Sequence, residues 1–138
     1  MIRRALIFGL VFAVMQAAPT QHEVKSKPCE GMTQQEMNVC AGAEFKLADA
    51  ELNRLYQELL KKAEGNQLAT TKIKKAEQSW IVYRDAYLEA MYPAENKQKE
   101  YGSIYPMESM MFRTELTRRQ IAAIKDLLGQ YSDQKPAD

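Results

Sequence analysis

Apolar residues recur at spacings of three and four along three stretches of this chain, and this pattern constrains the fold more than any other feature. The first stretch follows Thr33, the second runs from about Leu68 to Met91, and the third begins at Pro106. Each stretch predicts an amphipathic helix with one apolar stripe. No stretch alternates apolar and polar residues, as a half-buried strand would, over more than a few positions. The sequence therefore predicts an all-α protein, a small antiparallel bundle of about three helices.

Local signals mark the ends of the helices. Thr33 and Glu36 form a capping-box sequence before the first helix, and Gly65 is suited to its end. Pro93 stops the second helix, and Gly129 is expected to close the third. The stripes expected to face the core are, helix by helix, Met37, Cys40, Leu47, Leu52, Leu55, Tyr56 and Leu59, then Ile73, Ala76, Trp80, Tyr83, Tyr87 and Met91, then Met107, Met110, Thr114, Thr117, Ile121, Ile124 and Leu128.

The start of the chain has the features of a secretory signal peptide. Arg3 and Arg4 precede an apolar run from Ala5 to Met15, and the small residue Ala17 follows it. The run is too short to span a bilayer, which takes about 20 apolar residues. We expect cleavage after Ala17 and a periplasmic or secreted protein with no membrane attachment. The mature chain is then expected to hold a flexible arm (residues 18–28), one helical domain (residues 29–129) and a disordered tail (residues 130–138).

The mature chain is nearly neutral and carries two cysteines. The full sequence has 19 Lys and Arg against 18 Asp and Glu, and loss of Arg3 and Arg4 with the leader changes the net charge from +1 to −1. Such a domain has no electrostatic reason to bind nucleic acid or an anionic membrane. In an oxidising compartment, Cys29 and Cys40 predict a disulfide that ties the N-terminal arm to the first helix.

Motifs for catalysis and for cofactor binding are absent from the sequence. The one histidine, His22, lies in the predicted arm, which argues against a His-based triad and a multi-histidine zinc site. No glycine-rich phosphate loop or H-E-x-x-H motif occurs, and Cys-x10-Cys does not match a thioredoxin-like motif. We therefore predict a protein that is not an enzyme and that needs no metal or cofactor.

A group of aromatic and polar residues stands beside the apolar stripes. Trp80 is large enough to anchor a three-helix core, and Arg84 is expected to pair with Asp49 on the facing helix. A binding surface is the alternative, because Trp, Tyr and Arg dominate interface hot spots. The core role is favoured, since aromatic residues at helical spacing are usually buried. The residues assigned to this core and its polar network are Asp49, Asn53, Tyr56, Trp80, Tyr83, Arg84 and Asp85.

The polar stretch Pro93–Tyr105 is expected to form a loop between the second and third helices. It is long for a connection between helices, and long loops are often functional. Because it lies outside the three stripes, we expect it to contribute little to the core; an ordinary connector is the alternative to a binding loop. The residues it offers to a partner are Lys97, Lys99, Tyr101, Gly102, Ser103 and Tyr105.

The order and spacing of these groups resemble the LprI-type lysozyme-inhibitor domain. The resemblance runs from Cys29 to about Leu127 and is carried by the cysteine pair with Thr33 and Glu36, Ala48-Asp49-x-x-Leu52-Asn53-x-x-Tyr56, Gln78-x-Trp80-x-x-Tyr83-Arg84-Asp85, Gly102-Ser103-Ile104-Tyr105-Pro106 and Leu116-Thr117-x-Arg119. It implies an exported helical domain with a protein partner such as a lysozyme or lysozyme-like hydrolase, whose inhibition would protect peptidoglycan. An immunity or interaction module for another protein target is the alternative, followed by a cell-wall-processing enzyme.

One departure from the family concerns a second cysteine pair. Family members usually carry a third cysteine just after the Arg-Asp pair and a fourth just before the Leu-Thr pair. Here the matching positions hold Leu88 and Phe112. The resemblance thus implies that a hydrophobic contact replaces a second disulfide between the last two helices, and it supports the pairing of Cys29 with Cys40.

Overall fold

The structure, a computed structural model, describes residue 29 and residues 31–133. The predicted signal peptide, the arm over residues 18–28 and the last five residues (134–138) lie outside the described residues.

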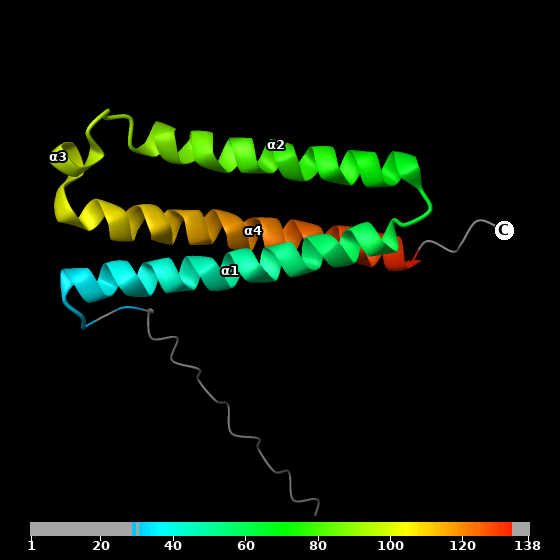
Figure 1. The fold of residues 1–138 in the computed structure, drawn as a ribbon, viewed down its shortest axis with the longest axis horizontal. Coiled ribbons are helices and arrows are strands. Elements are labelled where there is room, and N and C mark those ends of the chain that lie inside the picture. Colours follow the sequence, from blue (N-terminus) through cyan, green and yellow to red (C-terminus); the bar gives the residue numbers. More distant parts are fainter. Residues whose placement is uncertain (1–28, 30, 134–138) are drawn as a thin grey trace, which may run out of the picture.

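Three long helices form the protein: α1 (Gln34–Lys62), α2 (Gln67–Met91) and α4 (Tyr105–Asp133). Helices α1 and α4 run side by side in the same direction, and α2 returns antiparallel to both (Figure 1). A short helix α3 (Lys97–Tyr101) and a 3-10 turn η1 (Gly102–Ile104) connect α2 to α4. The described residues contain no strand, and the prediction of an all-α bundle is confirmed.

The α1–α4 pair is the tightest contact of the bundle. Small side chains allow it: Ala41 and Ala48 of α1 and Thr114 and Thr117 of α4 are all buried. Each buried threonine hydroxyl donates 2.8 Å to the carbonyl oxygen four residues earlier in its own helix, so neither polar group is left unpaired.

The main apolar core lies where α1 turns into α2, and we call this region the core end. Leu59 and Ile124 are among its most buried side chains, and Ile73 joins them from α2. Burial of such aliphatic side chains contributes roughly 1.5–3 kcal/mol each before entropy is counted. The buried cluster comprises Leu52, Leu55, Leu59, Ala63, Ile73, Ile121, Ile124 and Leu128, with Tyr56 and Trp80 packed against it.

Helix α2 is turned relative to the expected stripe, and it packs less closely on its neighbours than α1 packs on α4. Tyr83 is 55% exposed and Tyr87 and Ala76 are also exposed, so their predicted core positions are wrong. Ile73 and Trp80 lie on the inner face as predicted, and Glu77, Arg84 and Leu88 join them there in place of Ala76, Tyr83 and Tyr87. Leu47 of α1, at 67% exposed, was likewise wrongly placed in the core.

Most of the predicted helix ends are confirmed. The Thr33 amide donates 2.8 Å to a Glu36 carboxylate oxygen, and the Glu36 amide donates back to the Thr33 hydroxyl, which completes the capping box. Gly129 does not end the last helix, because α4 continues to Asp133. Residues 130–133 of the predicted disordered tail are therefore helical. A single glycine inside a helix costs about 1 kcal/mol relative to alanine, which the flanking turns can absorb.

Candidate functional site: the disulfide end

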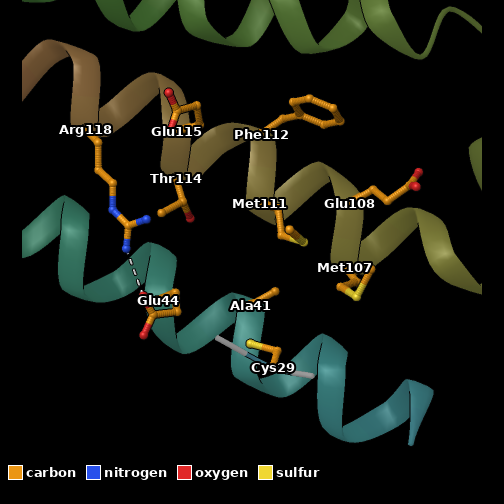
Figure 2. Close-up of a pocket in the computed structure, with 10 residues that line it drawn as sticks. All are labelled: Cys29, Ala41, Glu44, Met107, Glu108, Met111, Phe112, Thr114, Glu115 and Arg118. Atoms are coloured by element: carbon orange, nitrogen blue, oxygen red, sulfur yellow. Dashed lines mark hydrogen bonds and ion pairs between the residues drawn. The ribbon is translucent and has the colours of Figure 1, made fainter. Parts of the chain in front are cut away.

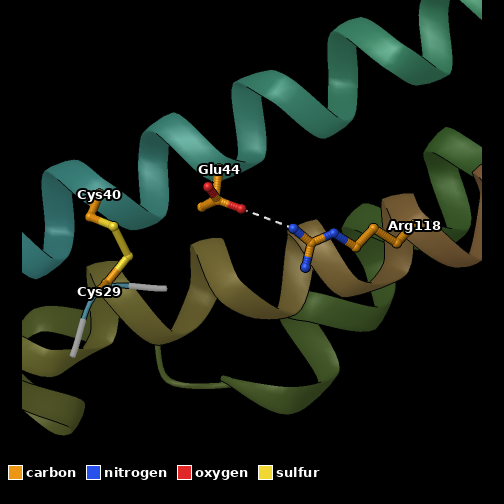
Figure 3. The surroundings of a disulfide bond; sticks show 4 residues. All are labelled: Cys29, Cys40, Glu44 and Arg118. Carbon is orange, nitrogen blue, oxygen red and sulfur yellow. Dashed lines mark hydrogen bonds and ion pairs between the residues drawn. A yellow bond between two sulfur atoms is a disulfide. The ribbon is translucent and has the colours of Figure 1, made fainter. Parts of the chain in front are cut away.

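A disulfide lies at the end of the bundle opposite the core end, where α1 and α4 both begin (Figure 3). It joins Cys29 to Cys40, with 5.8 Å between the two Cα atoms. Cys29 and Gly31 both have positive φ angles, 76° and 80°, and this lets the chain reverse before α1 and lie against it. We call the region formed by the disulfide, α3, η1 and the first three turns of α4 the disulfide end.

An apolar groove of about 430 Å³ lies between α1 and α4 at this end (Figure 2). Ala41 and Cys29 line it from one side, and Met107 and Met111 from the other. An ion pair across the two helices bounds the groove, with 2.9 Å between Arg118 Nη2 and Glu44 Oε2. The remaining lining residues are Glu108, Phe112, Thr114 and Glu115.

Large apolar side chains gather at the surface around this groove. Met111 is 49% exposed and Phe112 is exposed beside it. Across the disulfide, Met32 and Val39 line a second, shallower hollow together with Cys40, and both side chains are exposed. Exposed apolar groups that cluster in this way mark binding surfaces.

The stretch Pro93–Tyr105 is more ordered than the predicted loop, because α3 and η1 occupy most of it. The Asn96 side chain caps α3 by accepting a 3.0 Å hydrogen bond from the Lys99 amide. Gly102 has a φ of 72°, a backbone conformation that favours glycine at this turn. We call the element formed by α3 and η1 the tip.

Tyrosine rings anchor the tip to the bundle. The buried Tyr92 ring lies edge-on to the rings of Tyr101 and Tyr105, with centroids 5.2 Å and 5.0 Å away. The Tyr92 hydroxyl donates 3.3 Å to Glu108, and burial with this neighbouring carboxylate raises the pKa of Tyr92. The Tyr101 hydroxyl accepts a hydrogen bond from the Ala94 amide. As expected, no residue of this stretch is buried and none belongs to the core cluster, yet its tyrosines pack on Tyr92 and hold the tip against the bundle.

This packing divides the six residues predicted to face a partner. Tyr101 and Tyr105 are half-buried in the aromatic cluster. Lys97 Nζ is held 2.7 Å from Glu89, a hydrogen bond that raises the pKa of Lys97. The exposed residues of the tip include Lys99, Gly102, Ser103 and Ile104.

The residues of the Trp-Tyr-Arg-Asp motif do not all lie on the same face of α2. Arg84 lies over the Trp80 ring, 5.2 Å from its centroid, and its Nε donates 2.9 Å to Asp85. The hydrogen bond from Arg84 lowers the pKa of Asp85, and Arg113 of α4 lies 3.6 Å from the same carboxylate. The Arg113–Asp85 ion pair ties α2 to α4, whereas Tyr83 is exposed.

The predicted ion pair between Asp49 and Arg84 does not form. Asp49 instead accepts a 3.1 Å hydrogen bond from Asn53, four residues along the same helix. The reason lies in the packing, because α2 leans on α4 rather than on α1, and Arg84 is already held by Trp80 and Asp85.

One polar contact between α2 and α4 was not predicted from the sequence. Glu77 accepts a 3.0 Å hydrogen bond from Gln120, and burial raises the pKa of this carboxyl group. The charge of Glu77 adds to burial in raising the pKa of Tyr56 on α1. The only available signal was a second 3-4 register on α2, in which Glu77 and Arg84 replace Ala76 and Tyr83 on the inner face.

Within the described residues, no group of three or more His, Cys, Asp and Glu side chains is placed to hold a metal ion. None of the helices described is both long enough and apolar enough to cross a bilayer.

The family model described as "Lysozyme inhibitor LprI" matches residues 26–124 of the chain. The chain belongs to the LprI lysozyme-inhibitor family. An uncharacterized protein of Rhizobium meliloti (strain 1021) is 30% identical over 138 aligned positions, which cover 91% of this chain and 96% of the relative. No solved structure matches the chain. The family match spans the disulfide, the groove, the tip and most of the core cluster.

Leu88 and Phe112, at which the resemblance implies a second cysteine pair in other members, lie on α2 and α4. Leu88 of α2 is buried, and Phe112 of α4 lies with its ring centroid 6.3 Å from that of Tyr92. Phe112 is 40% exposed, and a direct contact between Leu88 and Phe112 stays a prediction.

Proposed function

We propose that this LprI domain is an exported protein-binding domain that inhibits lysozyme-like hydrolases and so protects peptidoglycan. Membership of a family named for lysozyme inhibition supports an inhibitory role. The Cys29–Cys40 disulfide supports residence in an oxidising compartment, periplasmic or extracellular.

The observation that carries the proposal is the gathering of exposed apolar side chains at the disulfide end. Ile104 of the tip is 42% exposed, and it directly precedes α4, whose first turns carry Met111 and Phe112. Interface cores are rich in Met and aromatic residues, and a few such side chains carry most of the binding energy. The disulfide end is therefore the surface that we assign to the hydrolase.

The tip suits the shape and charge of a lysozyme cleft. A lysozyme cleaves its substrate with two carboxyl groups in a cleft, and an inhibitor must fill that cleft and offer donors to those acids. The exposed Lys99 ammonium and Ser103 hydroxyl are such donors. Because Tyr92, Tyr101 and the Asn96 cap hold the tip in place, binding would lose little conformational entropy.

The test is a lysis assay on purified peptidoglycan with several lysozyme types and the oxidised mature domain. Wild type should slow lysis, and Ile104→Asp should raise the inhibition constant about tenfold or more, since it places a charge in the contact. Lys99→Glu should slow association, and the effect should shrink as salt rises.

Matched controls lie at the other end of the bundle. Leu68→Asp and Lys74→Glu make the same changes at exposed positions near the core end and should leave inhibition unchanged. No inhibition of any lysozyme by the wild type would contradict the proposal, and capture of a different protein would favour an immunity or interaction module. Hydrolysis by the domain alone would favour a wall-processing enzyme.

A further inference from the structure

The outer flank of α2 carries an apolar stripe that faces away from the other helices of the described residues. Tyr83 and Tyr87 stand on it with ring centroids 5.8 Å apart, and both are exposed. Small residues continue the stripe on either side: Ala76 and Ser79 before the tyrosines and Ala90 after them, all exposed. We call these five residues the α2 stripe.

None of the five residues of the α2 stripe is charged. The charged side chains of the same segment are turned elsewhere, with Glu77 and Arg84 on the inner face. Asp85 is held by Arg84 and Arg113 on the side toward α4. Val82, 69% exposed, widens the apolar surface beside the stripe. A helix face of this kind is suited to packing against another helix.

The spacing of the α2 stripe is symmetric about Tyr83. Its positions are separated by three, four, four and three residues, so the pattern reads the same in both directions. An antiparallel copy centred on Tyr83 would set Tyr87 against Ser79 and Ala90 against Ala76. Tyr87 would then pack against the small Ser79, the two small alanines would let the helix ends approach, and the two tyrosines at position 83 would meet at the axis.

The charges beside the stripe select the antiparallel arrangement. Lys72, Lys74 and Lys75 lie in the first half of α2, and Glu89 lies near its end. Antiparallel pairing places Lys75 of one copy near Glu89 of the other, whose carboxylate bonds Lys97 of its own chain while its side chain stays 69% exposed. Parallel pairing would oppose lysine to lysine. Complementary charges of this kind set helix orientation in coiled coils.

We propose that the α2 stripe is the interface of a two-fold symmetric dimer, in which the α2 helices of two copies pack antiparallel. A two-fold contact uses the same patch on both copies, as this symmetric spacing requires. The stripe is about 21 Å long at 1.5 Å per residue, which is short for a permanent interface. The dimer is therefore expected to form and dissociate with concentration, and it leaves both disulfide ends exposed at opposite ends of the pair.

The test is analytical ultracentrifugation of the oxidised mature chain across a wide concentration range. The mass of the wild type should rise toward twice the monomer value, and Tyr83→Glu should stay monomeric. Ile81→Glu is the matched control, because Ile81 is also exposed on α2 but lies on the other flank; it should dimerise like the wild type.

A cross-link supplies an independent readout. Because position 83 meets itself at the axis, Tyr83→Cys should form a disulfide-linked dimer several-fold faster than Ile81→Cys. A wild type that stays monomeric at every concentration would overturn the proposal without reference to any variant. Dimers of Tyr83→Glu as stable as those of the wild type would overturn it as well.

Discussion

At the core end, aliphatic side chains from three helices close into one buried cluster, whereas at the disulfide end α1 and α4 leave an apolar groove open between them. The core end is surrounded by exposed lysines such as Lys61, Lys62 and Lys72. The disulfide end instead exposes Met111 and Ile104 and adds a covalent link. Apolar surface that stays exposed for a partner adds nothing to the stability of the free domain. At the disulfide end, the disulfide and the tyrosine cluster compensate for part of this missing stability.

The largest effect is expected from the core end. Leu59 is 1% exposed, so Leu59→Ala should leave a cavity and lower the free energy of unfolding by roughly 3–5 kcal/mol. Leu47→Ala, the same change at an exposed position of α1, should stay within about 0.5 kcal/mol. Thermal and urea denaturation measure both variants. Equal losses in the two variants would show that the division between buried core and exposed surface is drawn wrongly.

The next-largest loss of stability is expected from removal of the disulfide. Closing the chain between Cys29 and Cys40, 11 positions apart, is worth about 3 kcal/mol in the chain-entropy model. The double variant Cys29→Ser/Cys40→Ser should have a free energy of unfolding lower by this amount, measured by denaturation. Reductant should lower the free energy of unfolding of the wild type to the same level. Because Cys29 lines the groove, the double variant should also lose binding of the proposed partner. Two reactive thiols in native exported protein would contradict the assignment.

A smaller effect should separate the two kinds of residue in the tip. Tyr101 is half-buried against Tyr92, so Tyr101→Ala should cost about 1–2 kcal/mol of stability. Ser103 is exposed, and Ser103→Ala should be neutral in denaturation, within about 0.5 kcal/mol, while weakening inhibition. If Tyr101→Ala melts like the wild type, the tip is not held by its aromatic cluster.

The smallest effect concerns pH. Burial raises the pKa of Glu77, so the protonated carboxyl group favours the folded state. This contribution to stability is complete below the pKa of Glu77 in the unfolded chain, and it is lost as pH rises through the higher pKa of the folded state. Glu77→Gln should therefore be at least as stable as the wild type at about pH 7, with the difference fading toward about pH 4.

Asp85 supplies the control of opposite sign for this pH dependence. The hydrogen bond from Arg84 lowers the pKa of Asp85, so the stability it contributes is present at neutral pH and is lost on acidification through the lowered pKa. Asp85→Asn should be less stable than the wild type at about pH 7, and this difference should shrink as pH falls. Parallel pH profiles for the Glu77 and Asp85 variants would contradict both assignments.

Local signals predicted the helices well. The capping box of Thr33 and Glu36 and the stripe from Thr114 to Leu128 depend on neighbours in sequence, and both are present. Asn96 and Gly102 shape the tip, but a five-residue helix is too short for periodicity to reveal.

The face that α2 buries could not be predicted in the same way. Two 3-4 registers fit the sequence of this helix, one through Ala76 and Tyr83 and one through Glu77 and Arg84. Hydrophobicity favours the first, yet the bundle buries the second, because Gln120 of α4 and the Trp80 ring satisfy the two charged groups. Only the tertiary contacts supply those partners, and the choice leaves Tyr83 at the surface.

Hydrogen exchange on the domain with and without a lysozyme that it inhibits tests most directly the division between a stabilising end and a binding end. We expect new protection in residues 97–112 and around Val39, with no change at the surface between Lys61 and Lys75. Protection confined to the Lys61–Lys75 region, with the disulfide end exchanging as in the free domain, would contradict that division.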